Sequence, residues 1–255
     1  MSLTPEMNGK TALVTGAASG LGRAAALSLG RAGADLCLVD VNGDGLAETA
    51  AMLPDSNILL HTANLADPDS CAPAVAASVD KFGQLDALCN IAGIVRMSHT
   101  DQMPRSDWDL TIAINLTAPF LLSQAAIPHL LESTSEGGGA IVNVASSAAF
   151  IGEAYAAAYC ATKAGLVNMT KAMAMEYTRK PIRINAVAPG GMMTNIGNTM
   201  SFPEEAEMDL VARYSGLRGM VEVADAADMI AILASPAGRA FHGACINIDA
   251  GITAG

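Results

Sequence analysis

The most constraining feature of the sequence is a glycine-rich turn close to its N-terminus. The apolar segment TALV (11–14) runs directly into TGAASGLG (15–22), and a helical pattern follows. In this G-x-x-x-G-x-G pattern, Gly16 permits a tight turn, Gly20 lets the backbone approach a pyrophosphate, and Gly22 lets helix and strand pack closely. The helix N-terminus would face the negative charge of the phosphates. A strand, a glycine turn and a helix in this order predict a dinucleotide-binding unit rather than an ordinary glycine-rich turn.

One carboxylate discriminates between the two nicotinamide dinucleotides. Asp40 ends the next predicted strand, 18 residues after Gly22. At this place an acidic side chain binds the ribose hydroxyls of the adenosine half and repels a 2′-phosphate. The neighbouring positions carry no arginine or lysine to bind such a phosphate; they are Ala17, Ala18, Ser19, Val41 and Asn42. We therefore predict that the protein uses NAD rather than NADP.

Short apolar segments alternate with longer, alanine-rich helical patterns along the chain. The predicted strands are TALVT (11–15), LCLVD (36–40), NILLHTA (57–63), LDALCN (85–90), AIVNVAS (140–146), IRINAVAP (182–189) and ACINIDA (244–250). Strands that are apolar on both faces and separated by helices form a parallel sheet covered on both sides. The sequence therefore predicts one doubly wound α/β domain over residues 1–255. The Met- and Gly-rich segment 191–220 interrupts the alternation and is interpreted as a substrate lid.

Composition and charge exclude several classes of partner. The chain has 255 residues, 14 Lys and Arg against 25 Asp and Glu, and a net charge of −11, which disfavours nucleic acid and anionic membranes as partners. Only 15% of residues are charged, which indicates that part of the surface is covered by another chain. The N-terminus lacks the pattern of a secretory signal, and the uncharged stretch 110–131 contains Asn, Gln, His and Pro, so we expect a cytoplasmic protein without a membrane span. The five Cys and four His are scattered, and no metal site is expected.

Tyr159 and Lys163 stand four positions apart in a predicted helix, so both side chains project from one face. A tyrosine with a pKa near 10 is a poor base at neutral pH. A nearby lysine ammonium, together with the positive nicotinamide ring of an oxidised cofactor, favours the phenolate and makes proton transfer feasible. The alternative interpretation is a surface pair without a chemical role.

Two serines close the strand that precedes this helix, at the sheet edge where open α/β sheets bind ligands. The Ser146 hydroxyl is placed to hold a substrate oxygen beside Tyr159, and Ser147 is the alternative because successive strand side chains point in opposite directions. From the residues alone, the choice between the two serines stays open.

Taken together, TGAASGLG, NIAG (90–93), INLT (114–117), NVAS (143–146), YCATK (159–163) and APGGMMT (188–194) resemble the short-chain dehydrogenase/reductase family over nearly the whole chain. The resemblance implies a single Rossmann-type domain with a seven-stranded parallel sheet, commonly a homotetramer. It also implies a catalytic tetrad of Asn115, Ser146, Tyr159 and Lys163. In that scheme Ser146 orients the substrate oxygen and Tyr159 exchanges its proton. Lys163 binds the nicotinamide ribose and lowers the tyrosine pKa, and Asn115 helps to hold a water next to Lys163.

The same resemblance, with the glycine turn, assigns the cofactor contacts. They are Gly16, Ser19, Gly20, Leu21, Gly22, Asp40, Val41, Asn64, Leu65, Asn90, Ala92, Gly93, Tyr159, Lys163, Pro189, Gly190, Met192 and Thr194. Two positions depart from the family pattern. Ile91 replaces the second Asn of the usual N-N-A-G, which loosens a structural hydrogen bond. Asn64 replaces an Asp that reads the adenine amino group, and its amide oxygen can still accept that hydrogen bond.

These features predict an NAD-dependent oxidoreductase that interconverts a secondary alcohol and a ketone. The alternative is a catalytically silent dinucleotide-binding protein that acts through partners; the complete tetrad argues against it. An enoyl reductase would place the Tyr and Lys further apart. The lid carries Met192, Met193, Met200, Phe202, Met208 and Met220. These flexible apolar side chains suit a bulky or cyclic apolar alcohol, unless they only pack the lid or a subunit contact. The alanine-rich helices over 107–131 and 155–178 are the expected contacts of a tetramer.

Overall fold

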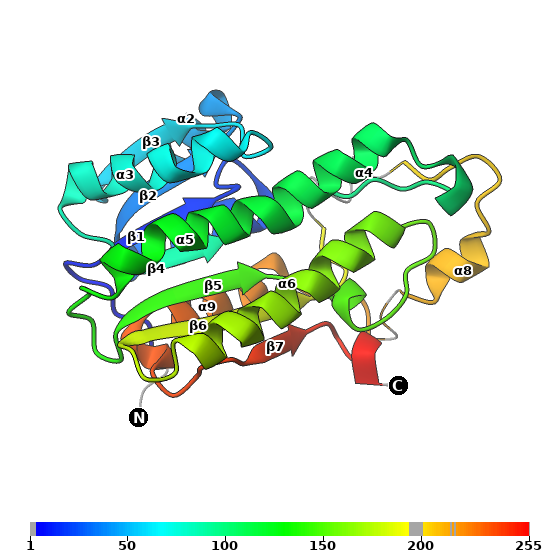
Figure 1. The fold of residues 1–255 in the computed structure, drawn as a ribbon. Helices are drawn as coiled ribbons and strands as arrows, with labels where there is room; N and C mark the ends of the chain where they lie inside the picture. Colours follow the sequence, from blue (N-terminus) through cyan, green and yellow to red (C-terminus); the bar gives the residue numbers. More distant parts are fainter. Residues whose placement is uncertain (1–3, 194–200, 215, 217, 255) are drawn as a thin grey trace.

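All seven predicted strands join one parallel sheet in a computed structural model of the chain, and helices cover both of its faces (Figure 1). The structure describes residues 4–193, 201–214, 216 and 218–254. The strands are β1 (Thr11–Thr15), β2 (Asp35–Asp40), β3 (Ile58–Thr62), β4 (Ala87–Asn90), β5 (Gly139–Val144), β6 (Ile182–Pro189) and β7 (Cys245–Ile248). The main helices are α1 (Gly20–Arg31), α2 (Gly43–Ala51), α3 (Cys71–Phe82), α4 (Arg105–Ile112), α5 (Ala118–Leu130), α6 (Ala157–Glu176), α8 (Met208–Ala212) and α9 (Val223–Ala234).

The order of the strands fixes where a ligand can bind. It runs β3-β2-β1-β4-β5-β6-β7, and each neighbouring pair is parallel. The direction of winding reverses between β1 and β4, so the loops at the carboxyl ends of these two strands diverge and leave a crevice. The predicted doubly wound α/β fold with a seven-stranded parallel sheet is confirmed, and the glycine turn after β1 lies at this crevice.

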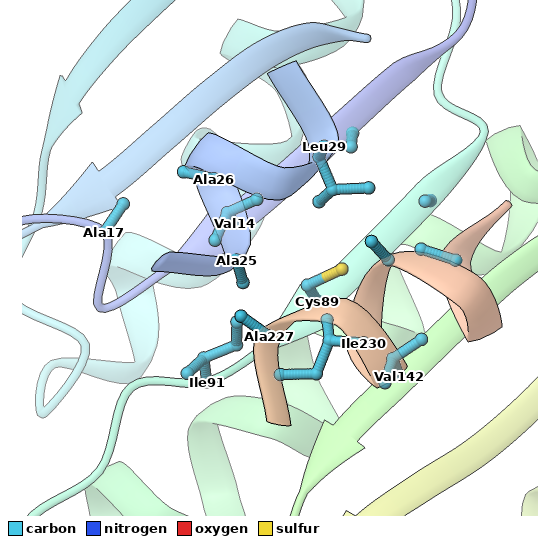
Figure 2. Close-up of a cluster of buried hydrophobic side chains, with 14 of the residues drawn as sticks. Val14, Ala17, Ala25, Ala26, Leu29, Cys89, Ile91, Val142, Ala227 and Ile230 are labelled. Carbon is cyan, nitrogen blue, oxygen red and sulfur yellow. The ribbon is translucent and has the colours of Figure 1, made fainter. Parts of the chain in front are cut away.

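Two apolar clusters hold the helices to the sheet. Because side chains alternate along a strand, Val14 of β1 points to one face and its neighbour Leu13 to the other. On the Val14 face, Leu29 of α1 and Ile230 of α9 pack against the strands (Figure 2). On the opposite face, Leu122 of α5 belongs to a second cluster that also includes residues of α3 and α6. The sheet is therefore buried on both faces, as its nearly continuous apolar strands predict.

The long helix predicted over 107–131 is a helical segment with an irregular turn inside it. A π-helical turn over Ala113–Thr117 separates α4 from α5. Pro119 lacks an N–H, so the carbonyl of Asn115 receives no α-helical hydrogen bond from it. The segment Arg105–Leu130 has the length and hydropathy of a membrane-spanning helix. However, Leu122 and Leu130 are buried in the core against the sheet.

The segment that was interpreted as a lid is described in part. Met192 forms an isolated parallel bridge with Val221, and the short helix α8 lies between them along the chain. Residues 194–200, 215 and 217 fall outside the described residues, and with them Thr194 and Met200. The lid function stays a prediction.

Candidate active site

The glycine turn after β1 has the geometry that its sequence predicts. Gly16 and Gly20 adopt φ values of +70° and +51°, in the left-handed region where a side chain is disfavoured. A Cβ on Gly22 would collide with the carbonyl oxygen of Gly16, so helix α1 packs directly on the turn that precedes it. A Cβ on Gly16 would lie 3.0 Å from the Ala92 backbone. The three glycines therefore bring the turns after β1 and β4 and the start of α1 into close contact.

The start of helix α1 suits an anionic ligand. Ser19 is its N-cap residue, but the Ser19 side chain makes no capping hydrogen bond. The first backbone N–H groups of a helix have no partner within the helix and carry its positive dipole end, which is where phosphate binds. The nearby guanidinium of Arg23 is already committed, because it donates to the Ala18 carbonyl and to Glu48 at 2.8 Å. Arg23 is therefore not free to bind a 2′-phosphate.

Asp40, at the end of β2, is held by the same turn. Its Oδ2 accepts a hydrogen bond from the Ala18 N–H at 3.1 Å, and its Oδ1 accepts one from the Asn42 N–H at 3.0 Å. Two backbone donors thus fix the carboxylate at the rim of the crevice. The exposed side chain of Val41 stands beside it.

Thr15 connects the turns after β1 and β4, a role that sequence reasoning missed. Its hydroxyl accepts hydrogen bonds from the N–H groups of Ile91 and Ala92 at 2.9 and 3.0 Å. This contact keeps the NIAG segment against the glycine turn although Ile91 stands where the family pattern has Asn. The sequence did contain a signal for this role of Thr15, because a polar residue ends a buried strand there, just before Gly16.

A cavity of about 320 Å³ lies where these turns meet the ends of β5 and β6. Most residues assigned to the cofactor or to catalysis line it: Gly16, Ser19, Gly20, Leu21, Gly22, Asp40, Val41, Asn64, Leu65, Ala92, Gly93, Ser146, Tyr159, Lys163, Pro189, Gly190 and Met192. It is also lined by residues that sequence reasoning did not assign: Ala63, Ile91, Ile94, Ile114, Val144 and Ala145. These are mainly apolar and carry no chemical signature in the sequence. The lining residues come from the ends of several neighbouring strands, and a cavity of this volume suits a small-molecule ligand or cofactor.

Two assigned side chains are engaged elsewhere. Asn90 is buried and donates to Asn143 Oδ1 at 2.8 Å, which makes it a support beneath the cavity. The Asn64 Oδ1, which was expected to accept from an adenine amino group, accepts from the Ala66 N–H at 3.1 Å. Asn90 thus joins β4 to β5, and Asn64 holds the turn that follows β3.

Tyr159 and Lys163 meet in the cavity as their spacing predicts. They lie on successive turns of α6, and the Lys163 Nζ is 5.6 Å from the centroid of the Tyr159 ring. The same Nζ donates a hydrogen bond at 2.7 Å to the carbonyl of Val144, the last residue of β5. Burial lowers the pKa of Lys163 to about 8. The ammonium is thus predominantly protonated at neutral pH and is anchored at the sheet edge.

The surroundings of Tyr159 determine its acidity. Burial raises its pKa to about 12, a hydrogen bond with Ser146 lowers it, and the nearby Glu153 and Cys160 raise it. Ser146 lines the cavity, and its Oγ accepts from the Ala148 N–H at 3.2 Å. Among the described residues that line the cavity, Ser147 does not appear. The geometry therefore places Ser146, rather than Ser147, beside the tyrosine hydroxyl.

Asn115 lies behind the cavity, in the π-helical turn. Its Oδ1 accepts from the Ile94 N–H at 2.9 Å, and its Nδ2 donates to the Ile94 carbonyl at 2.8 Å and to the Thr162 Oγ1 at 3.3 Å. A Cβ on Gly93 would lie 3.3 Å from the Asn115 Oδ1 and 3.5 Å from the Lys163 Nζ. Asn115 thus approaches Lys163 across the bare backbone of Gly93 and ties the loop after β4 to α6.

These features define a class of protein. A doubly wound sheet carries, at its switch point, a glycine turn, the carboxylate of Asp40 and the side chains of Ser146, Tyr159 and Lys163 around one cavity. The residues fit a nicotinamide dinucleotide, because the glycines provide a cradle that a Cβ would fill and the helix terminus provides donors for the phosphates.

Comparison with known proteins places the chain in a family. A family model described as short chain dehydrogenase matches residues 10–204. The D-threitol dehydrogenase of Mycolicibacterium smegmatis is 37% identical over 97% of this chain and 94% of its own length. A 3-ketoacyl-(acyl-carrier-protein) reductase of Brucella melitensis in complex with NADH has a TM-score of 0.87 and 31% identity, over 97% of this chain and 100% of that one. A short chain dehydrogenase of Burkholderia cenocepacia in complex with NADP has a TM-score of 0.86 and 30% identity, over 97% and 99% of the two chains.

The chain belongs to the short-chain dehydrogenase/reductase family. It shares that family's Rossmann-type fold, and the family comprises oxidoreductases that act on alcohols and ketones with a nicotinamide dinucleotide. Its structural neighbours include complexes with both forms of the cofactor, so relationship alone does not choose between NAD and NADP.

Proposed function

We propose that this protein is an NAD-dependent dehydrogenase that interconverts a secondary alcohol and a ketone. The observation that carries the proposal is the meeting of Ser146, Tyr159 and Lys163 in the cavity that the glycine turn also lines. A nicotinamide dinucleotide supplies a hydride acceptor or donor when bound. The protein supplies the group that moves the proton and the groups that hold the substrate oxygen.

In the oxidising direction, the phenolate oxygen of Tyr159 takes the proton of the alcohol. The Lys163 ammonium favours the phenolate that this step requires, which offsets part of the effect of burial on the Tyr159 pKa. Ser146 donates a hydrogen bond to the substrate oxygen as negative charge develops on it. Asn115 acts behind Lys163 and keeps the loop after β4 in place.

NAD is proposed over NADP because of Asp40. Its carboxylate is fixed by two backbone N–H groups at the rim of the cavity, where a 2′-phosphate would meet a like charge. Arg23, the nearby cation that could offset this repulsion, is committed to Ala18 and Glu48. NADP, which carries the 2′-phosphate, would therefore bind more weakly than NAD.

Two substrate classes are considered. The lid methionines predict a bulky or cyclic apolar alcohol, with Met192 in the cavity lining, although Met193, Met208 and Met220 are more than half exposed. The second class is a substrate with further hydroxyl groups. D-threitol, the polyol in the name of a 37% identical relative, belongs to the second class.

The reaction is tested with Tyr159→Phe. This variant should lose about 10²- to 10⁴-fold in kcat, the range that general acid–base catalysis contributes, while it keeps its affinity for NADH. Absorbance of NADH should be followed over a panel of cyclic alcohols, steroids, sugars and hydroxy acids. If the variant kept most of the wild-type activity on a good substrate, Tyr159 would not be the proton-transfer group. A fully inactive wild type that binds NADH would instead support the silent dinucleotide-binding alternative.

We further propose that the chain functions as a cytoplasmic homotetramer. Trp108 on α4, Phe120 on α5 and Met175 on α6 have large exposed apolar side chains. Helices α5 and α6 cover the same face of the sheet (Figure 1), so this face suits a second copy of the chain. Light scattering of the purified protein tests the proposal, and a monomer mass would contradict it.

A further inference from the structure

The last residues that the structure describes fold into a tight turn after the final strand. β7 ends at Ile248, and a short helical turn follows over Ile252–Ala254. The buried carboxylate of Asp249 joins the two. Its Oδ1 accepts the Gly251 N–H at 2.9 Å, and its Oδ2 accepts the Thr253 N–H at 3.0 Å and the Thr253 hydroxyl. Both carboxylate oxygens are therefore acceptors for donors of this turn.

The backbone of the turn depends on these hydrogen bonds. Ala250 adopts a φ of +52°, in the left-handed region that is unfavourable for alanine and persists only where surrounding contacts enforce it. The bonds from Gly251 and Thr253 to the Asp249 carboxylate span this residue and supply such contacts. The carboxylate of Asp249 therefore determines the path of the chain after β7.

This C-terminal turn, Asp249–Thr253, lies directly against Gly190, which follows β6 and lines the cavity. The Gly190 N–H donates to the Ile248 carbonyl at 2.9 Å. A Cβ on Gly190 would lie 2.8 Å from the Asp249 Cα and 3.0 Å from the Ile252 Cδ1, so the backbone of Gly190 and the C-terminal turn are in close contact. Gly190 is thus held by a hydrogen bond to β7 and by the packing of Asp249 and Ile252.

Gly190 borders the reacting end of the cavity. In the order of the strands, β2 with Asp40 lies on one side of β1 and its glycine turn, while β5 and β6 lie on the other side, with Ser146 and Gly190 at their ends. Tyr159 and Lys163 line the cavity as well. A cofactor that exchanges a hydride beside Tyr159 and binds its adenosine ribose at Asp40 must place its nicotinamide half at the end where Gly190 lies.

We propose that the C-terminal turn positions the nicotinamide half of the cofactor by holding Gly190 in place, with Asp249 and Ile252 as the positioning residues. The inference rests on the cofactor of the proposed function, since it assumes that the nicotinamide lies beside Tyr159. Among the described residues that line the cavity, neither Asp249 nor Ile252 appears, so both act through Gly190. Loss of either contact weakens the binding of the nicotinamide half and leaves that of the adenosine half unchanged.

The test compares NADH with ADP-ribose, which lacks the nicotinamide ring, by calorimetric titration of the full chain. The adenosine and the two phosphates are common to both ligands, so the ratio of the Kd for ADP-ribose to the Kd for NADH isolates the nicotinamide half. The wild type should bind NADH more tightly. In Asp249→Asn, the amide NH₂ must face a donor of the turn in either orientation, because both carboxylate oxygens are acceptors. The ratio should fall about 10-fold, as expected when a buried donor loses its acceptor.

A smaller change tests the packing contact separately. Ile252→Val removes the Cδ1 methyl group that meets Gly190 and should lower the ratio about 2- to 5-fold, the range expected for deletion of one buried methyl group. Ile58→Val is the matched control, because Ile58 begins β3, packs against the core and does not line the cavity. Its ratio should equal that of the wild type.

The proposal is overturned if Asp249→Asn keeps the wild-type ratio, or if it loses affinity for NADH and ADP-ribose by the same factor, because the turn would then support the fold alone. If Asp249→Asn did not fold, an unchanged ratio in Ile252→Val would overturn the proposal. A wild type that binds both ligands equally well would overturn it too. The proposed reaction is judged separately: a wild type that oxidises no alcohol of the panel but shows the expected ratios would contradict that reaction and support the role of the C-terminal turn.

Discussion

The Lys163 ammonium lies 5.6 Å from the centroid of the Tyr159 ring and is held there by a 2.7 Å hydrogen bond to the Val144 carbonyl. A cation at this distance stabilises the phenolate relative to the phenol, and its attachment to the end of β5 keeps it in place. The positive charge beside the tyrosine is thus positioned by the sheet.

Lys163→Met should therefore impair the chemistry as well as cofactor binding. Without the ammonium, only the hydrogen bond with Ser146 is left to oppose the effect of burial on the Tyr159 pKa, and we expect kcat to fall about 10²- to 10⁴-fold. The affinity for NADH, measured by fluorescence titration, should weaken because Lys163 also lines the cofactor cavity. A kcat within a factor of three of the wild type would show that Lys163 does not activate Tyr159.

The pH dependence of alcohol oxidation should respond to Glu153. Tyr159 must lose its proton to act as a base, so the rate should rise with pH towards its pKa. The polar and charged groups that act on the Tyr159 pKa are the Ser146 hydroxyl, the Cys160 thiol and the Glu153 carboxyl, and the Lys163 ammonium lies 5.6 Å from its ring centroid. The Glu153 carboxylate raises the Tyr159 pKa, so Glu153→Gln should lower it and move the rising limb of the profile to lower pH.

The shift is measured as the pH profile of kcat/KM for a simple secondary alcohol such as cyclohexanol. The matched control is Glu176→Gln, an exposed carboxyl at the far end of the same helix, and its profile should coincide with that of the wild type. A Glu153→Gln profile shifted to higher pH would contradict the predicted sign.

Much of the fold could be predicted because its signals are local. The apolar segments and the glycine turn determine the sheet and its switch point, and the spacing of Tyr159 and Lys163 is set by the geometry of a single helix. The π-helical turn at Asn115 and the left-handed backbone of Tyr155 could not be predicted in this way. The first needs the contacts of Asn115 with Ile94, 21 residues away, and the second depends on hydrogen bonds from residues 57 and 52 positions distant.

The site was predictable where chemistry requires a particular side chain. Ser146, Tyr159, Lys163 and Asp40 were assigned from the sequence because few residue types suit the proposed chemistry, and the structure brings all four to one cavity. Ile114 and Val144 line the same cavity, but apolar residues of this kind occur throughout the core, so their sequence context does not distinguish them. Thr15 acts through a contact with a segment about 76 residues later, which periodicity does not reveal.

Asp40→Asn should weaken the discrimination against NADP. The amide oxygen can still accept the Ala18 N–H, so the turn is retained, but the charge that would repel a 2′-phosphate is lost. We expect the ratio of kcat/KM for NADP to that for NAD to rise about 10- to 100-fold, which corresponds to relief of a like-charge contact. Asp55→Asn, an exposed carboxyl that does not line the cavity, is the control and should leave the ratio unchanged. A wild type that already prefers NADP would refute the assignment of Asp40.

Gly22→Ala should disrupt cofactor binding because the new Cβ would meet the carbonyl of Gly16. The turn or the helix must move, and we expect the Kd for NADH to rise more than about 10-fold, equivalent to 1.4 kcal/mol. Gly83→Ala is the control. Gly83 has a φ of +75° with open space around its Cα, so the substitution costs about 1–2 kcal/mol in stability without touching the cavity. Equal NADH affinities of the two variants would show that the packing at Gly22 does not shape the site.

The support beneath the cavity should be sensitive to the loss of one hydroxyl group. Asn90 donates to Asn143 Oδ1 at 2.8 Å, and Asn143 Nδ2 donates to Thr170 Oγ1 at 2.9 Å, so these buried side chains tie β4 and β5 to α6. Thr170→Val preserves the shape of the side chain but leaves the Asn143 Nδ2 without its acceptor, which costs about 1–3 kcal/mol for a buried polar group.

We therefore expect the free energy of unfolding of Thr170→Val, from urea denaturation at a fixed protein concentration, to fall by that amount. The exposed Thr178, just beyond the end of α6, provides the control, and Thr178→Val should stay within about 0.5 kcal/mol of the wild type. If both variants were as stable as the wild type, the Asn143 amide would have found another acceptor, and the contact with Thr170 would not be needed to hold α6 against the sheet. A loss of stability in Thr170→Val with kcat unchanged would show that the network supports the fold beneath the site without positioning Tyr159.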